Sequence, residues 1–155
     1  MTAEFGHHYI AGQWLSDAPN GISEVENPSD GSVLGTAPNG SAGLADNAVM
    51  AARDAFESTD WASNPRQRAA ALLEFADILE SRADEIAALM ARENGKVLAQ
   101  ARHEVAAGYG EAKYYAGVAR NVFGRTFESG SGKLSLMTRE PSGVVSVIVP
   151  WNAPV

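Results

Sequence analysis

The residues best placed to do chemistry are Pro150, Trp151 and Asn152, which directly follow the apolar run "GVVSVIV" at 143–149. Continuous apolar residues are typical of a strand that is buried on both faces of a parallel sheet. Ligands of such sheets bind beyond the carboxyl ends of the strands, so this tripeptide is a candidate site. The side-chain amide of Asn152 carries two hydrogens that can donate to a developing oxyanion. In the opposing interpretation Trp151 packs and Asn152 forms a turn. The residues alone favour this structural interpretation, because single asparagines are common in turns.

Other polar residues are weaker candidates. His7 and His8 near the N-terminus and His103 in a helical pattern have no second ligand at metal spacing, so we interpret all three as surface or structural residues. Gly130 and Gly132 flank a single serine with no helix after them, which argues against a phosphate-binding loop.

The remaining charged residues fit helix surfaces. Asp84, Glu85 and Glu93 are interpreted as helix-face charges and not as an acid–base pair. The segment "RENGK" at 92–96 is interpreted as a helix end with a basic residue well placed for the helix dipole.

Composition excludes several classes of function. The chain of 155 residues contains no cysteine, which excludes disulfides, thiolate metal sites and a thiol nucleophile, and which fits a reducing cytosol. Its formal net charge of −7 argues against a nucleic-acid partner. The N-terminus has no signal-peptide pattern, and no apolar run approaches the ~20 residues of a membrane helix. We therefore expect a cytoplasmic protein with no membrane partner.

The first 40 residues predict short strands. "HYIAGQWL" at 8–15 and "GSVLGTAP" at 31–38 each read as one strand, and "NPSDGS" at 27–32 carries the Asp-Gly signal of a tight turn. This part is too short and too polar to hold a core of its own.

Four helices are predicted next. The first begins at the cap Ser41, the second at Asn64 followed by Pro65, and the third ends at Asn94-Gly95. The fourth runs from about residue 97 to residue 123, and its internal glycines mean that packing must hold it.

The last part predicts a hairpin and then one buried strand. "RTFES" and "KLSLMTRE" alternate around "GSG", which is typical of a hairpin over 125–140. The strand at 143–149 needs neighbouring strands and helices that this sequence does not contain. We therefore expect the chain to be the front part of a longer α/β protein.

The order of several motifs then resembles a known family. These motifs are "YIAGQWL", "NPSDGSVLGTAP", "AVMAARDAF", a lone Trp61, "RAAALLEFADILE", "ENGK", "YYAG" and "REPSGVVSVIVPWNAPV". From Tyr9 onward the chain resembles the N-terminal part of an NAD(P)-dependent aldehyde dehydrogenase.

This resemblance implies an incomplete α/β fold, made of a Rossmann-like cofactor-binding domain and an oligomerisation hairpin. Residues 1–124 would be strands and helices of the cofactor-binding domain, and 125–141 the oligomerisation hairpin. Residues 142–155 would be the first Rossmann-type strand and the start of the active-site turn. A homodimer or homotetramer is the implied assembly.

The resemblance also implies a reaction and its site. Asn152 matches the asparagine of the oxyanion hole, and Ile148, Val149, Pro150, Trp151 and Asn152 would line the cleft for NAD or NADP. An aldehyde would be oxidised to a carboxylic acid through a cysteine thiohemiacetal and thioester. Glu104 falls where some members place a ligand to a monovalent cation, and no other metal is implied.

Departures from the family pattern leave alternatives open. Val97 stands where proline is frequent, and the catalytic cysteine, the water-activating glutamate, the phosphate-contacting lysine and the glycine-rich turn would lie beyond residue 155. Without a cysteine the chain alone is expected to be inactive. One alternative is a non-catalytic fragment that acts as an oligomerisation module. Another is an acyl-phosphate or semialdehyde reductase of the same superfold. The substrate aldehyde and the choice between NAD and NADP are not determined by these residues.

Overall fold

The N-terminal strands form two small sheets. The structure is a computed structural model that describes residues 4–155, so residues 1–3 of the first predicted segment lie outside the described residues. Strands β1 (Glu4–Phe5), β5 (Val33–Pro38) and β4 (Ile22–Glu26) form one sheet in the order β1-β5-β4, with β1 parallel and β4 antiparallel to β5. The predicted turn at 27–32 joins β4 to β5, so the strand before it is β4 rather than "HYIAGQWL".

The segment "HYIAGQWL" is a hairpin, which corrects the prediction of one strand. Strand β2 (His8–Ile10) pairs antiparallel with β3 (Gln13–Leu15) across Ala11 and Gly12. Both turn residues have positive φ, 52° and 78°, as the favoured two-residue hairpin turns require. Alanine seldom adopts positive φ, so Ala11-Gly12 lacks the residue type that the first position of such a turn favours.

The four predicted helices are present. They are α1 (Ala42–Ser58), α2 (Pro65–Ser81), α3 (Ala83–Asn94) and α4 (Leu98–Ala119). Ser41 Oγ accepts a hydrogen bond of 3.2 Å from the amide of Leu44, and Asn64 Oδ1 accepts one of 3.1 Å from the amide of Gln67. These bonds satisfy amides that a helix start leaves without partners, and they confirm both predicted N-caps.

Helix α4 ends at Ala119, four residues before the predicted end at Phe123. Asn121 Nδ2 donates a 2.7 Å hydrogen bond to the carbonyl of Gly117, which satisfies an acceptor in the last turn. Val122 and Phe123 are 56% and 72% exposed, so no packing surface extends the helix through them.

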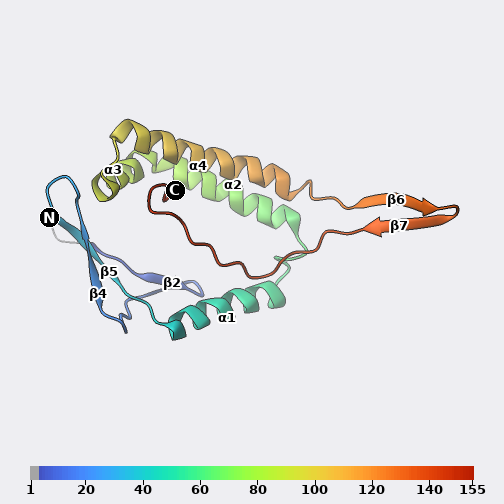
Figure 1. Ribbon diagram of the computed structural model, residues 1–155, viewed down its shortest axis with the longest axis horizontal. Coiled ribbons are helices and arrows are strands. Elements are labelled where there is room, and N and C mark those ends of the chain that lie inside the picture. Colours follow the sequence, from blue (N-terminus) through green and yellow to red (C-terminus); the bar gives the residue numbers. More distant parts are fainter. Residues whose placement is uncertain (1–3) are drawn as a thin grey trace.

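The core lies between α2, α3 and α4, which pack side by side (Figure 1). Its buried cluster consists of Leu79, Ala87, Met90, Ala101 and Val105. Small alanine side chains let the helix backbones approach closely. The helical part of the chain is therefore the rigid frame on which the C-terminal segment lies.

Strands β6 (Arg125–Gly130) and β7 (Lys133–Met137) form the predicted hairpin, which projects well beyond the helices (Figure 1). β7 ends at Met137 and not at Glu140. All residues of β6 are exposed, and Leu134 and Leu136 on β7 are each 70% exposed. The hairpin thus has no core beneath it within the described residues.

The predicted strand at 143–149 is not formed, although all of these residues are described. Val147 and Ile148 are 73% and 94% exposed, so the described residues do not bury this segment. Its burial on both faces in a parallel sheet stays a prediction, since that prediction requires elements which this sequence does not contain. The physical reason for the missing strand is that a strand needs a neighbour to pair its amides and carbonyls, and none of the strands in the described residues pairs with the segment. The segment instead runs back from the hairpin and ends near α2 and α4 (Figure 1).

Candidate functional site

The candidate site is a tight turn over 150–153. The amide of Ala153 donates a 3.2 Å hydrogen bond to the carbonyl of Pro150, so Trp151 and Asn152 are the two central residues of the turn. Pro150 fixes its own φ and stiffens the entry to the turn. The interpretation of Asn152 as a turn former is therefore confirmed. The turn is made by the main chain, so it does not determine what the side-chain amide binds.

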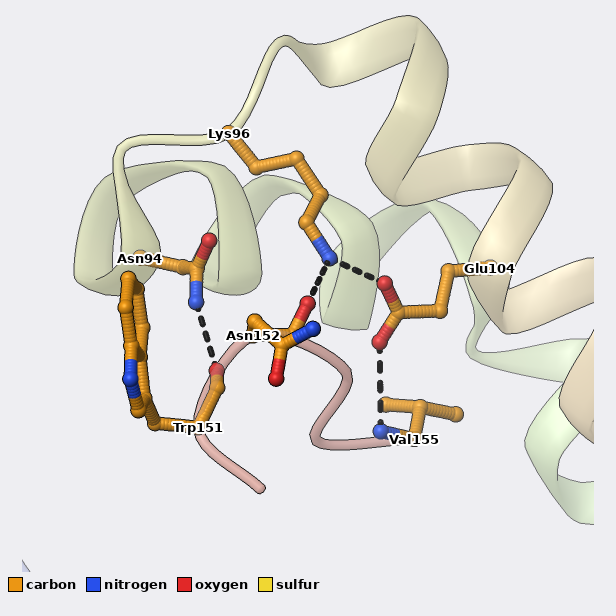
Figure 2. Close-up of polar contacts among 6 residues, drawn as sticks. All are labelled: Asn94, Lys96, Glu104, Trp151, Asn152 and Val155. Carbon is orange, nitrogen blue, oxygen red and sulfur yellow. Dashed lines mark hydrogen bonds and ion pairs between the residues drawn. The ribbon is translucent and has the colours of Figure 1, made fainter.

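The last residue of α3 and the linker that follows it hold the main chain of this turn. Asn94 Nδ2 donates a 2.7 Å hydrogen bond to the carbonyl of Trp151, and Lys96 Nζ donates one of 2.8 Å to the carbonyl of Asn152. Figure 2 shows both contacts reaching the turn from the same side of the linker. Two consecutive carbonyls are thus fixed by two side chains that are two residues apart.

Gly95 makes this linker geometry possible. It ends α3 in the left-handed conformation, with φ of 75°, and its amide donates to the carbonyl of Ala91 at 3.1 Å. A Cβ at this position would lie 2.8 Å from Cγ of Pro28. The linker therefore needs glycine both for its backbone conformation and for the close approach of Pro28.

Glu104 on α4 completes the arrangement. Its Oε2 forms an ion pair with Lys96 Nζ, and its Oε1 accepts a 3.3 Å hydrogen bond from the amide of Val155 (Figure 2). The side chains of Lys96 and Glu104 are only 14% and 16% exposed, so the pair is screened less by water than a surface pair. We call Asn94, Lys96 and Glu104 the turn clamp, since together they bind three main-chain atoms of residues 151–155.

The side chain of Asn152 stays outside these contacts. It is exposed, and in the part of the chain that the structure describes its amide has no hydrogen-bond partner. Both amide hydrogens are therefore available to a ligand.

Trp151 is 76% exposed, so the predicted packing role is not fulfilled within this chain. It lies at the edge of a cavity of about 260 Å³ that α3 lines with Ile86, Leu89 and Met90. Ile148 and Val149 precede it in the same exposed segment. The residues predicted to line a cofactor cleft are thus all exposed in this chain.

The other candidates do not join this site. His7 Nδ1 lies 3.0 Å from Ser16 Oγ beside β2, and His103 is on an exposed part of α4. Among residues 4–155 no group of three or more His, Cys, Asp or Glu side chains could hold a metal ion. The role of Glu104 as a cation ligand stays a prediction, and its carboxylate is already paired with Lys96.

Sequence reasoning missed Asn94 and Lys96 as site residues. Both were interpreted as parts of a helix end, and the cap at Gly95 confirms that interpretation. Their contacts with the turn span 57 and 56 residues of sequence, respectively. The only local signal was a lysine directly after an Asn-Gly helix end, and it does not indicate what the lysine binds.

None of the helices in the described part of the chain combines the length and the apolar character that crossing a membrane requires.

Known proteins are similar to this chain in sequence and in fold. The model of the aldehyde dehydrogenase family matches residues 14–155. An alpha-ketoglutaric semialdehyde dehydrogenase of Bacillus subtilis is 40% identical over 96% of this chain and 30% of its own length. An NAD-dependent aldehyde dehydrogenase from Sinorhizobium meliloti superposes with a TM-score of 0.83 at 32% identity, over 90% of this chain and 28% of its own.

A third relative was solved with ligands. It is an indole-3-acetaldehyde dehydrogenase of P. syringae, a cysteine-to-alanine variant in complex with NAD+ and IAA. It superposes with a TM-score of 0.89 at 31% identity, over 99% of this chain and 31% of its own.

The chain thus spans about 30% of the length of the curated relatives it matches. The matches confirm the predicted fold class, the N-terminal part of an aldehyde dehydrogenase-type α/β fold. The chain belongs to the aldehyde dehydrogenase family.

Proposed function

We propose that the complete protein is an NAD(P)-dependent dehydrogenase that oxidises an aldehyde to a carboxylic acid, with Asn152 as a donor in its oxyanion hole. The observation that carries this proposal is the free side-chain amide of Asn152, which stands on a turn whose main chain is held by other residues. Membership of the aldehyde dehydrogenase family supports the reaction class.

The proposed reaction needs one contribution from this chain, a hydrogen-bond donor to the oxyanion. When a thiolate adds to an aldehyde, the carbonyl oxygen becomes an alkoxide, and an amide hydrogen already aimed at that oxygen stabilises the charge as it develops. The chain contains no cysteine, so the thiol belongs to a part of the complete protein outside these residues. The cysteine-to-alanine substitution in the P. syringae relative supports a cysteine elsewhere in the family fold.

The exposed segment before Asn152 fits one half of a nicotinamide cofactor. Ile148, Val149 and Trp151 present apolar side chains, which suit the flat face of a nicotinamide ring. Residues 148–152 include no basic side chain and no glycine, so they do not fit the phosphates. When bound, NAD(P)+ supplies the hydride acceptor, and these residues would form one wall of its cleft.

Two further features belong to the proposal. The exposed apolar side chains of Leu134 and Leu136 support a role for the β6–β7 hairpin in a homodimer or homotetramer. The same exposure favours the second candidate function, a non-catalytic module that docks its hairpin onto another subunit. The two candidates differ in whether Asn152 matters for turnover.

The deciding experiment is steady-state kinetics of the complete protein with an aldehyde panel and both cofactors. Asn152→Ala should lower kcat by ~10²–10³, as the loss of other oxyanion donors does. Asn47→Ala is the matched control, because Asn47 is exposed on α1 and remote from the turn in the sequence. A wild-type kcat for Asn152→Ala would refute the oxyanion role, and no aldehyde oxidation by the wild type would favour the docking module.

A further inference from the structure

We propose that Lys96 is a positioning residue for the active site: held by Glu104, it fixes the main chain at Asn152 and thereby aims the Asn152 amide. This inference deepens the proposed function and rests on the oxyanion role of Asn152. Lys96 itself touches no reacting atom in this scheme.

The turn clamp binds only the main chain of the turn. Lys96 Nζ donates to the carbonyl of Asn152 at 2.8 Å, and Asn94 Nδ2 donates to the preceding carbonyl at 2.7 Å. The Asn152 side chain is not used for its own anchoring. A side-chain amide that donates to an oxyanion needs this arrangement, because amide hydrogens that are already bonded within the turn cannot bind a ligand.

The core fixes the position of Glu104. It is on α4 between Ala101 and Val105, both of which are fully buried in the core cluster. Its carboxylate binds the Lys96 ammonium with one oxygen and the amide of Val155 with the other. A hydrogen bond from a charged donor is stronger than one between neutral groups, so the carbonyl of Asn152 is held more strongly than that of Trp151, whose donor is the neutral amide of Asn94.

Close packing keeps the turn against α4 as well. A Cβ at Gly108 would lie 2.9 Å from Cγ1 of Val155 and 3.5 Å from Cδ2 of Leu79. The absent side chain at Gly108 therefore lets the segment after Asn152 rest directly on the helix. Polar and apolar contacts act on the same short segment, so the loss of Lys96 should shift the turn rather than unfold the helices.

Positioning matters because misplacing a catalytic group by about 1 Å can cost ~10² in rate. In the complete enzyme Lys96→Met should lower kcat by ~10–10² and leave the KM of the cofactor nearly unchanged. Lys96→Arg keeps the charge and the donors and should restore part of the loss. Lys113→Met is the matched control, because it breaks another lysine–glutamate pair of α4, with Glu80, away from the turn.

A double-mutant cycle separates positioning from a general structural role. If Lys96 acts through Asn152, the variant carrying both Lys96→Met and Asn152→Ala should be no slower than Asn152→Ala alone. The inference would be overturned if the loss of kcat in the double variant equalled the product of the two single losses. A wild-type kcat for Lys96→Met would also overturn it. Glu104→Gln provides the same test if Lys96→Met fails to fold, and it should also lower kcat.

The main-chain contact has its own readout, which keeps this inference distinct from the proposed function. Lys96→Met should speed hydrogen exchange of the amides at 151–155, measured by mass spectrometry on the complete protein, and Lys113→Met should not. Faster exchange together with a wild-type kcat for Asn152→Ala would mean that the clamp exists and the oxyanion role is wrong. Unchanged exchange would overturn the clamp itself.

Discussion

The side-chain amide of Asn94 donates a 2.7 Å hydrogen bond to the main-chain carbonyl of Trp151, 57 residues further along the chain. The end of α3 and the turn that carries Asn152 are therefore one structural unit.

Asn94→Ala should loosen the turn without unfolding α3. The variant loses one hydrogen bond, with a net worth of about 0.5–1.5 kcal/mol. Hydrogen exchange of the Ala153 amide, measured on the complete protein, should become faster. Asn94→Asp should behave like Asn94→Ala, since a carboxylate cannot donate, and exposed Gln100→Ala should have no effect. Protection in Asn94→Asp equal to wild type would contradict this role.

Gly95→Ala should destabilise the linker. Alanine would be forced to the φ of 75° found there, and its Cβ would lie 2.8 Å from Cγ of Pro28. We expect a loss of about 1–3 kcal/mol, measured as a lower Tm. Gly110→Ala is the contrasting variant, because Gly110 is inside α4 with nothing within 4 Å of an added Cβ. It should gain about 0.5–1 kcal/mol. Equal shifts for the two variants would rule out this account.

Val105→Ala should weaken the frame on which the clamp stands. Val105 is 0% exposed at the centre of the core cluster, and removing two methyl groups leaves a cavity. The expected loss is roughly 2 kcal/mol in the free energy of unfolding. Val122→Ala, at a side chain that is 56% exposed, should change it by less than about 0.5 kcal/mol. Chemical denaturation measures the free energy of unfolding of both variants. Similar losses in the two would contradict the assignment of Val105 to the core.

The turn between β4 and β5 should give a measurable pH effect. Hydrogen bonds from the hydroxyl and the amide of Ser32, at 2.6 Å and 2.9 Å, lower the pKa of Asp30 below its ordinary value of 3.8. The folded pKa thus lies below the unfolded one. The stabilisation by this carboxylate is therefore present above the unfolded pKa and is lost as the pH falls through the folded pKa. NMR titration should show the pKa of Asp30 rising toward 3.8 in Ser32→Ala, and an unchanged value would exclude this cause.

Local signals predicted the helical frame well. Ser41, Asn64 and Gly95 cap their helices because each cap contacts residues within four positions along the chain. The turn at Ala11-Gly12 was missed for a local reason, since alanine rarely takes the φ of 52° observed there.

Long-range contacts could not be predicted. The pattern at 143–149 indicates a buried strand, yet Ile148 is 94% exposed, and none of the described strands pairs with its segment. The apolar pattern therefore indicates that these residues suit a buried position, although the described residues of this chain leave them exposed. Lys96 likewise shows which atom it binds only when Asn152, 56 residues later, is brought to it.

The main-chain character of the turn clamp has a consequence for evolution. Because Asn94, Lys96 and Glu104 bind two carbonyls and one amide, most side chains in the turn can be exchanged without loss of anchoring. Only proline at residue 155 would remove one of the bonded groups, since it has no amide hydrogen. Mutation can therefore change the residues around the Asn152 amide while the main chain that carries it stays in place.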